Sequence, residues 1–500
     1  MNRSLVGLVG LAASVMPSFA HGQALPDPPP PTVISLRPAA APVPALKERL
    51  LPERRELVAG NAAVFYHRAI EMMLQQRLQR QAEAPPPRPP ATRPASIEEA
   101  ISRWNTGPLR EIPLEEARKQ LQLYGDILHE VELGARREAC DWEFDRREEG
   151  ISLLIPDIQE MRSLSRIVVL RARLAVLEGK TDEALHWHQT GFAMARHIAQ
   201  GPLLIQALVG IAAFNEMARS LEELIQAPGT PSLYWALVNL PRPFIDLSPA
   251  IEAERYVLER ELPLLRQIET ETWSLDQARQ FSDDMLRVLA GMTFVSILPS
   301  DAKAGPRPPR LPDLPPRLGM AAAVMKVYPE ARRTLLAEGR PAAEVEEMPA
   351  VQVAALYTLR AYQQLRDEVF KWANLPYWQS SRGGDEAMRG SVRWANPLLL
   401  MFRQLLPAIQ AARWASVRSD RQLNAIECIE AIRLYAAAHD GALPPSLEAI
   451  TEAPTPLDPA TGKPFEYKVG ETTATLTAPV PPGAPNHYTS MIRYELKLSR

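Results

Sequence analysis

The chain has 500 residues, of which 46% are hydrophobic and 23% charged, a composition typical of globular proteins of about two to four domains. Its formal net charge is −3, from 56 basic and 59 acidic residues. Because no basic excess is available to neutralise phosphates, nucleic acid is not an expected partner. The 49 prolines cluster between segments with helical periodicity.

The N-terminus (1–24) has the pattern of a secretory signal. Arg3 supplies a positive charge ahead of the apolar run 5–16, and small residues follow that run. The pattern predicts export to the periplasm or the extracellular space, with cleavage near Ala24 or, as the alternative, Ala20. The apolar run is shorter than the roughly 20 residues that span a bilayer, so we expect no transmembrane span in the mature chain. Retention of the signal as an anchor is the competing interpretation.

Proline and alanine dominate residues 25–45, which predicts an extended tether that packs into no core. Helical periodicity then extends over 46–303, with a proline-rich interruption at 84–94. A second proline-rich segment, 304–317, is the expected domain linker. It separates the first helical domain from a second helical region at 318–420.

The clearest pair of predicted helices spans residues 157–199. Glu178-Gly179-Lys180 interrupts the periodic pattern, as a glycine at a helix C-terminus does. Small residues recur where the two helices of a tetratricopeptide repeat approach each other: Ala172, Gly179, Ala184 and Gly191. Only one such unit occurs, whereas a solenoid needs about three. We therefore favour a generic helical hairpin that resembles this repeat.

Two segments ahead of the C-terminus have contrasting patterns. Residues 380–390 (SSRGGDEAMRG) predict a flexible loop, because paired glycines lie among polar side chains. A helical pattern then runs from Pro397 to about His439. Pro407 is expected to kink this helix, because a proline in a helix interior removes a backbone hydrogen bond.

The last 80 residues, 421–500, change to a period of two. Apolar and polar side chains alternate at 465–469, 473–478 and 492–498, which predicts three antiparallel strands that each bury one face. The preceding helix offers an apolar stripe to cover them: Ala425, Cys428, Ile432 and Tyr435. The predicted fold class is mainly α, a helical-hairpin array or bundle. Its small C-terminal α+β head consists of a long helix and a three-stranded antiparallel sheet.

Two parts of the chain resemble known families. AIRLYAAAHDGALPPSLEAI (431–450) and PLDPATGKPFEY (456–467) are similar to the globular head of type II secretion pseudopilins. This similarity implies the fold of the head and not pilus assembly, because the chain lacks the N-terminal helix of a prepilin. Residues 140–260 resemble an uncharacterised family of exported planctomycete proteins, through segments 137–144, 153–212 and 232–247. That resemblance implies an exported location and brings no known activity.

The densest cluster of metal-ligand residue types falls on one predicted helix. Two histidines on one helix face would be needed to share a metal, at a spacing of three or four. His186 and His188 are two residues apart and point about 200° apart, while His197 lies roughly 16 Å further along the axis. We therefore expect neither a metal site nor a cofactor here; the full cluster is Asp182, Glu183, His186, His188 and His197.

Cys140 and Cys428 are the only cysteines. In an exported protein they could form one disulfide that ties the first helical block to the last long helix. The alternative is two buried thiols that behave as small hydrophobic side chains. A nucleophilic role for Cys140 is disfavoured, because only His129 lies near it and its acidic neighbours would raise the thiol pKa.

Acidic residues elsewhere have simpler interpretations than catalysis. Asp458 is predicted to accept backbone N–H bonds and fix the turn before Gly462; a calcium site would need more acidic oxygens than this turn provides. The pairs Glu222-Glu223 and Glu346-Glu347 are interpreted as solvated helix faces. The sequence contains none of the common hydrolase, nucleotide-binding or metalloprotease motifs, so catalytic residues remain unassigned.

The favoured function is non-enzymatic: a protein-interaction or scaffold protein of the bacterial cell envelope, with another envelope protein as partner. One alternative is an envelope hydrolase that acts on peptidoglycan or peptide through carboxylates from separate helices. The other is lipid or small-molecule binding between helices. A cleft with paired carboxylates would favour the hydrolase, a shallow groove the scaffold, and an apolar tunnel the lipid binder. The sequence leaves the oligomeric state open.

Overall fold

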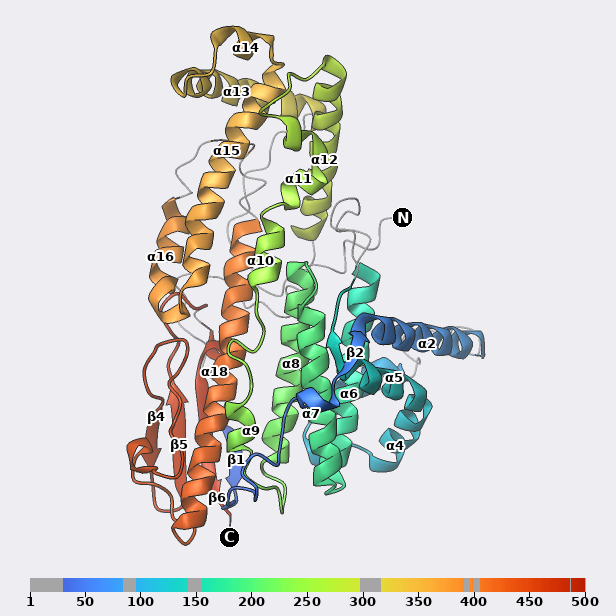
Figure 1. The fold of residues 1–500 in the computed structure, drawn as a ribbon, viewed down its shortest axis with the longest axis vertical. Coiled ribbons are helices and arrows are strands. Elements are labelled where there is room, and N and C mark those ends of the chain that lie inside the picture. The colour runs from blue at the N-terminus through green and yellow to red at the C-terminus, as the bar shows by residue number, and fades with distance from the viewer. Residues whose placement is uncertain are drawn as a thin grey trace.

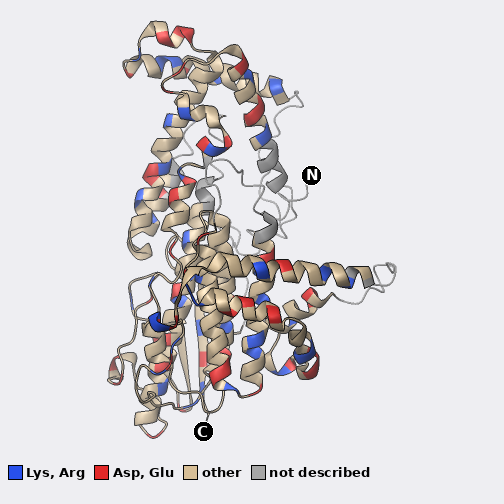
Figure 2. Ribbon diagram, turned by 45° about the vertical axis from the view of Figure 1, so that its right-hand side comes forward, with Lys and Arg blue, Asp and Glu red and all other residues tan. Residues whose placement is uncertain are grey.

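The computed structural model describes residues 30–83, 96–142, 155–296, 316–390, 396, 398, 405–485 and 487–499. The predicted signal peptide and most of the predicted linker 304–317 lie outside these residues. The described chain is mainly helical, as predicted, and forms an elongated body with a small sheet near one end (Figure 1). Acidic and basic residues are interspersed along the helices (Figure 2), in keeping with the small net charge.

The lower half of Figure 1 contains the first helices of the described chain. Its elements are η1 (Arg54–Glu56), β2 (Val58–Asn61), α2 (Ala62–Glu83), α3 (Ile97–Thr106), η3 (Leu109–Glu111), α4 (Leu114–Leu123), α5 (Gly125–Ala135), β3 (Arg137–Ala139), α6 (Ile155–Leu177), α7 (Thr181–Ala199), α8 (Leu204–Leu224) and α9 (Tyr234–Val238).

The chain then rises to the upper half and returns. This part comprises α10 (Ser248–Glu254), α11 (Val257–Glu261), η5 (Pro263–Gln267), α12 (Leu275–Ser296), α13 (Pro316–Ala337), α14 (Ala342–Glu347), α15 (Ala350–Phe370), η6 (Lys371–Asn374) and α16 (Tyr377–Gly390). The long helix α18 (Leu405–Ala438) leads back to η8 (Leu447–Ala449), β4 (Glu466–Val469), β5 (Thr473–Ala478), η9 (Tyr488–Ser490) and β6 (Ile492–Leu498).

The predicted hairpin is formed by α6 and α7, and α8 packs against both helices. Gly179 ends α6 at φ +70°, where the N–H of Lys180 bonds the carbonyl of Ala175, a glycine-based helix end. The closest approach involves Gly210 of α8, because a Cβ there would lie 2.6 Å from the carbonyl oxygen of Ala195 on α7. The packed unit is thus three helices, and its tightest contact is between α7 and α8.

The segment 380–390, predicted as a flexible loop, is part of helix α16 instead. Gly383 lies against the ring of Trp372, where a Cβ would come within 2.6 Å of the ring atom Cε2. The glycine therefore serves close packing and not chain flexibility. Helix α18 agrees better with the prediction, although it begins at Leu405 and Pro407 falls in its first turn. A proline is tolerated there because the first turn has no intrahelical acceptors for its N–H groups.

The sheet has four strands in the order β1-β6-β5-β4. Strands β4, β5 and β6 pair antiparallel, as predicted, with Leu476 opposite both Tyr467 and Tyr494. The fourth strand, β1 (Thr32–Leu36), lies parallel to β6 and places Ile34 beside Leu496. This corrects the prediction of a tether over 25–45, because the apolar side chains of Ile34 and Leu36 are buried in the core.

Helix α18 crosses the predicted boundary between 318–420 and 421–500 without a break. One hydrophobic core continues from α2 to the sheet, so the head shares its core with the helices. Glu222 of α8 joins the two parts: it accepts hydrogen bonds from the hydroxyl of Tyr494 at 2.6 Å and from the amide of Gln422 at 2.8 Å. Burial raises the pKa of Glu222. Its interpretation as part of a solvated face is therefore wrong.

Two buried arginines of α18 hold other segments in place. Arg421, which is 1% exposed, forms a bidentate ion pair with Asp458 at 2.8–2.9 Å and also donates to the carbonyls of Pro479 and Ser490. Asp458 also accepts the N–H of Ala460, as the turn interpretation predicts. Arg433 pairs with Glu430 at 2.5 Å and donates to the carbonyls of Arg37 and Thr230.

We predict that Gly210→Ala destabilises the protein by about 1–3 kcal/mol, because the added methyl group meets the backbone of α7. The matched change Gly191→Ala should cost less, since it meets only the flexible end of the Met217 side chain. Urea unfolding followed by circular dichroism measures both variants. Equal losses of stability would contradict the proposed tight contact between α7 and α8.

We predict that Arg421→Met lowers the free energy of unfolding by about 3–5 kcal/mol, because it leaves the carboxylate of Asp458 buried without its partner. The exposed pair of Arg332 with Glu346 provides a control, and Arg332→Met should cost about 0–1 kcal/mol. Urea unfolding distinguishes the two. A small effect of Arg421→Met would show that the buried pair is not needed to hold the turn at Asp458.

Candidate functional site

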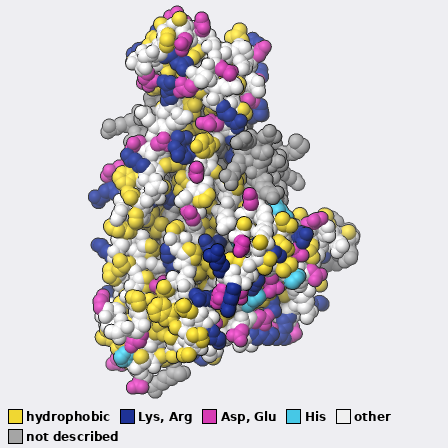
Figure 3. Space-filling model, viewed as in Figure 1, with side chains coloured by type: hydrophobic (Ala, Val, Ile, Leu, Met, Phe, Trp, Pro, Cys, Tyr) yellow, Lys and Arg dark blue, Asp and Glu magenta, His cyan; other side chains and the backbone are white. Residues whose placement is uncertain are grey.

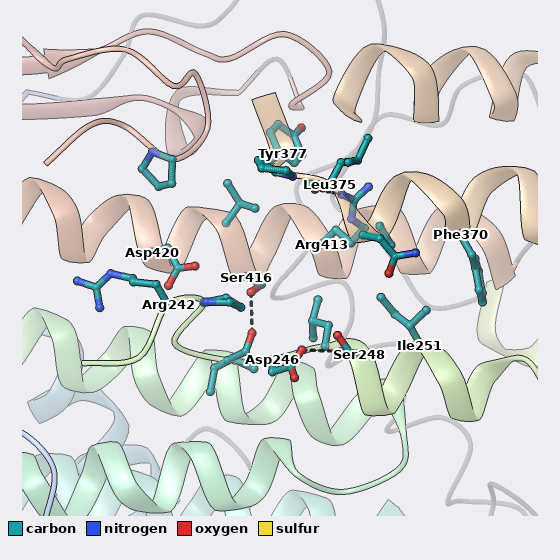
Figure 4. A pocket seen from close by; sticks show the side chains of 18 of the residues that line it. Arg242, Asp246, Ser248, Ile251, Phe370, Leu375, Tyr377, Arg413, Ser416 and Asp420 are labelled. Carbon is teal, nitrogen blue, oxygen red and sulfur yellow. Dashed lines mark hydrogen bonds between the residues drawn. The ribbon is translucent and has the colours of Figure 1, made fainter. Parts of the chain in front are cut away.

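A cleft of about 1040 Å³ is formed by described residues near the middle of the molecule. Three segments form it: one face of α18, the turn at 242–255 that leads through α10, and the end of α15 with η6 at 367–377 (Figure 4). It lies between the sheet end and the upper helices, at the level where α10, α16 and α18 come together (Figure 1). Eight of the residues that line the cleft are charged: Arg242, Asp246, Glu252, Arg255, Asp367, Lys371, Arg413 and Asp420.

The floor of the cleft is one stripe of α18. Its polar members Arg413, Ser416 and Asp420 recur at steps of three and four, so a single helix face presents them. The hydroxyl of Ser416 donates to the carbonyl of Ile245 at 3.0 Å, and the carboxylate of Asp420 accepts the N–H of Phe244 at 2.9 Å. These two bonds fasten the turn at 242–255 to the floor.

Phe244 anchors the same turn from its other side. Its ring lies 4.6 Å from that of Phe214 on α8 and 5.5 Å from that of Phe192 on α7, measured between centroids. Such aromatic contacts contribute about 0.5–1.5 kcal/mol beyond the burial of area. The wall is therefore positioned by the central helices, and the cleft does not depend on a loose loop.

Arg413 carries a charge that no carboxylate compensates among the described residues. Its side chain is 7% exposed, and its Nη2 donates to the carbonyl of Trp372 at 2.9 Å and to the hydroxyl of Ser380 at 3.0 Å. Its Nη1 is buried without a hydrogen-bond partner, and burial lowers the pKa of the guanidinium. A buried cation without a counter-ion is costly. The floor therefore favours negative charge at the Arg413 end of the cleft.

Asp420 lies seven residues further along α18, roughly 10 Å from Arg413 at 1.5 Å per residue. Burial raises the pKa of its carboxyl to about 6, although the N–H of Phe244 and the charge of Arg242 oppose this effect. Arg242 itself pairs with Glu427 at 3.3 Å and donates to the side chain of Asn424. The floor thus has a cationic end and an acidic end.

The rim adds side chains of both signs and an exposed apolar edge. Arg255 faces Asp367 at 3.8 Å, an ion pair in water-exposed positions. Leu375 is 43% exposed and stands next to Pro376 at the edge formed by η6. Such a lining suits a ligand with apolar and charged groups along its length.

The described residues that line the cleft limit the kinds of hydrolytic chemistry it can perform. Its lining contains neither histidine nor cysteine, so a nucleophile with an adjacent imidazole base is not formed by these residues. Of the carboxyl groups that line it, Asp420 is the one whose pKa is raised. Hydrolysis of a glycosidic bond needs two carboxyl groups in complementary protonation states. Asp420 can supply the protonated member of such a pair, and the lining contains three further carboxyl groups, Asp246, Glu252 and Asp367.

The predicted polar cluster on α7 is dispersed. His186 is partly exposed. It contacts Glu132 of α5 and Arg136, the residue that follows α5. His188 is fully buried and bonds the carbonyl of Ala184, while His197 bonds the hydroxyl of Tyr66 at 2.9 Å. Burial lowers the pKa of both buried histidines to about 4. Asp182 is exposed and Glu183 pairs with Arg171. In the described part of the chain, no group of three or more metal-ligand residues could hold an ion.

Cys140 and Cys428 are both free and buried, so the disulfide alternative is not realised in this structure. Cys140 lies beside β2, where Asn61 bonds the backbone of Asp141. Cys428 lies on α18 with its thiol 3.7 Å from the carbonyl of Pro456. Burial raises the pKa of both thiols, which makes a nucleophilic thiolate unfavourable.

The sequence interpretation missed the cleft altogether. One signal was available: Arg413, Ser416 and Asp420 recur at helical spacing on one face of α18, and buried polar residues of that kind need partners. The walls gave no signal, because residues 242–255 and 367–377 are more than 100 positions apart and meet α18 only in the folded chain.

Comparison with known protein families, curated proteins and solved structures finds no match to this chain. Among the helices of the described residues, none combines the length and the apolar character needed to cross a bilayer.

We predict that Asp420→Asn makes the protein more stable at pH 7 than the unmodified chain. Between the ordinary carboxyl pKa of 3.8 and the folded value of about 6, the folded state holds the proton more tightly than the unfolded state. Stability from this group therefore falls as pH rises through that window, by up to about 3 kcal/mol. The side chain of asparagine does not titrate, so the variant does not lose stability as the pH rises. Its amide oxygen can still accept the N–H of Phe244.

The measurement is urea unfolding of both proteins at pH 4 and pH 7. The stability difference between them should be small at pH 4 and should grow by pH 7. A difference that does not change with pH would mean that the carboxyl group of Asp420 titrates normally.

Proposed function

We propose that the protein is a non-enzymatic interaction or scaffold protein of the bacterial cell envelope, and that its cleft receives an extended segment of a partner envelope protein. The observation that carries this proposal is the composition of the cleft. A volume of about 1040 Å³, an exposed apolar edge at Leu375 and charges of both signs fit a polypeptide segment better than a small uniform ligand.

The charge distribution on the floor suggests how such a segment is oriented. The uncompensated guanidinium of Arg413 favours an acidic side chain or a C-terminal carboxylate near one end. The carboxyl group of Asp420, roughly 10 Å away along the helix, favours a basic group when it is ionised. An extended chain rises about 3.3 Å per residue, so these groups would be about three residues apart in the partner.

The envelope location is proposed from the sequence of the first 24 residues and from the resemblance of 140–260 to exported planctomycete proteins. The pseudopilin-like character of the last 80 residues is likewise a proposal from resemblance. It is compatible with the antiparallel arrangement of β4, β5 and β6 beside α18.

The hydrolase alternative has one observation in its favour, the pKa of about 6 for Asp420, which suits a general acid. Against it, neither histidine nor cysteine is among the described residues that line the cleft, so a nucleophile activated by an imidazole base is not formed there. The lipid alternative has less support, because charged residues line the cleft along its length.

A photo-crosslinking amino acid at Leu375 tests the proposal in intact envelopes of the source bacterium. We expect one defined polypeptide to be captured at Leu375, and not at Met325 of α13, which is also exposed but does not line the cleft. In a second variant, Ala373→Trp fills the cleft from η6 and should abolish the capture.

Capture that is equal at Met325, or that survives Ala373→Trp in a correctly folded protein, would rule out binding in the cleft. Release of peptidoglycan fragments or peptides by the purified protein, lost on Asp420→Asn, would favour the hydrolase instead.

A further inference from the structure

Figure 3 shows Lys and Arg side chains, with Asp and Glu side chains beside them, in the middle of the lower half. A second hollow is lined by arginines from separate segments of the chain. It has a volume of about 500 Å³ and is separate from the cleft. The segment 49–54 forms one side, and α9 with the residues that follow it, 236–241, forms another. Arg196, in the last turn of α7, completes the lining.

The hollow is lined by three arginines and a single acidic residue, Glu53. The carboxylate of Glu53 is already engaged by Arg49 at 3.6 Å and by Arg55 at 2.9 Å. Within the described chain, neither Arg54 nor Arg196 has an ion-pair partner. The lining therefore has a local excess of two positive charges, three arginines against one glutamate, although the whole chain has a net charge of −3.

Two of these arginines are partly removed from water. Arg196 is half-buried, and burial lowers the pKa of its guanidinium. The Nε of Arg49 is buried and makes no hydrogen bond, and the carboxylate of Glu53 lies 3.6 Å from it. A partly desolvated guanidinium without an ion-pair partner, such as that of Arg196, binds an incoming anion more strongly than a fully hydrated one, because less water must be displaced.

The backbone of this region is held in place before any ligand arrives. The amide of Gln189 on α7 donates to the carbonyl of Arg49 at 3.0 Å, which ties the segment 49–54 to the helix that carries Arg196. The backbone N–H of Glu53 bonds the carboxylate of Glu56 at 2.8 Å, which fixes the start of η1. The backbone that carries Arg49 and Arg54 is therefore held beside Arg196, and binding needs to order only the side chains.

We propose that this hollow is a binding site for a phosphoryl group. Guanidinium groups that approach from different segments match the several oxygens of a tetrahedral oxyanion, and each can donate two hydrogen bonds. The hollow is larger than a phosphate ion, so it has room for part of the molecule that carries the phosphoryl group. That molecule is either a soluble phosphorylated compound or a phospholipid headgroup. The proposal is independent of what occupies the cleft.

The test uses the full mature chain and two probes. Binding of inorganic phosphate is measured by isothermal titration calorimetry, and binding to vesicles of phosphatidylglycerol and phosphatidylcholine is measured by cosedimentation, with pure phosphatidylcholine vesicles as reference. The double variant Arg54→Gln/Arg196→Gln should weaken binding of the effective probe by about tenfold or more. The matched control Arg279→Gln/Arg332→Gln removes the same charge from α12 and α13 and should leave binding unchanged.

The two probes distinguish the sources of the phosphoryl group. Phosphate binding that the double variant loses, without vesicle binding, supports a soluble compound. Vesicle binding that depends on phosphatidylglycerol and is lost in the same variant supports a lipid headgroup. The proposal is overturned if neither probe binds the unmodified chain, or if the control variant weakens binding as much as the double variant. Circular dichroism at the same temperature verifies that both variants are folded.

Discussion

The structure depends on charges that one helix buries. Helix α18 carries Arg421 and Arg433 at positions where neither is exposed to water by more than 1%. Burial of a guanidinium is costly unless its donors are satisfied, and here the acceptors come from distant parts of the chain. Arg421 reaches the turn at Asp458 and two carbonyls of the C-terminal segment, and Arg433 reaches Arg37 and Thr230. One helix thereby specifies where the N-terminal strand, the α8–α9 connection and the sheet are placed.

The cleft arises from the same helix, about two turns before Arg421. There, only some of the polar groups on one face of α18 have partners. Ser416 and Asp420 bond the segment 242–255, while Arg413 has no carboxylate partner among the described residues. The contrast between Arg421, with its bidentate partner, and Arg413, without one, separates a structural arginine from a candidate binding arginine. The two arginines differ in whether a carboxylate pairs with them and not in burial, since both residues are more than nine-tenths buried.

Much of the local structure could be predicted from the sequence, because it is encoded in periodicity. The break at Gly179, the course of α18 and the alternation in β4, β5 and β6 are all local signals. The failures have a common physical cause, which is that long-range packing overrides local preference. Gly383 predicts a loop when the sequence is considered locally, but in the folded chain it packs against Trp372 within a helix. Glu222 has the sequence pattern of a solvated residue, but in the folded chain it is buried and bonded to Tyr494 and Gln422. The candidate sites could not be predicted because their walls come from segments far apart in sequence.

The pairing of β1 with β6 sets the order in which the fold can be completed. These strands are the first and last of the described chain. The pairing of Ile34 with Leu496 therefore forms only after β6 is present. Contacts of such large sequence separation are slow to form, because the loop between them loses much conformational freedom. A polypeptide that emerges N-terminus first therefore keeps β1 unpaired until β6 has been synthesised. Loss of β6 would leave β5 as an open edge able to pair with another chain.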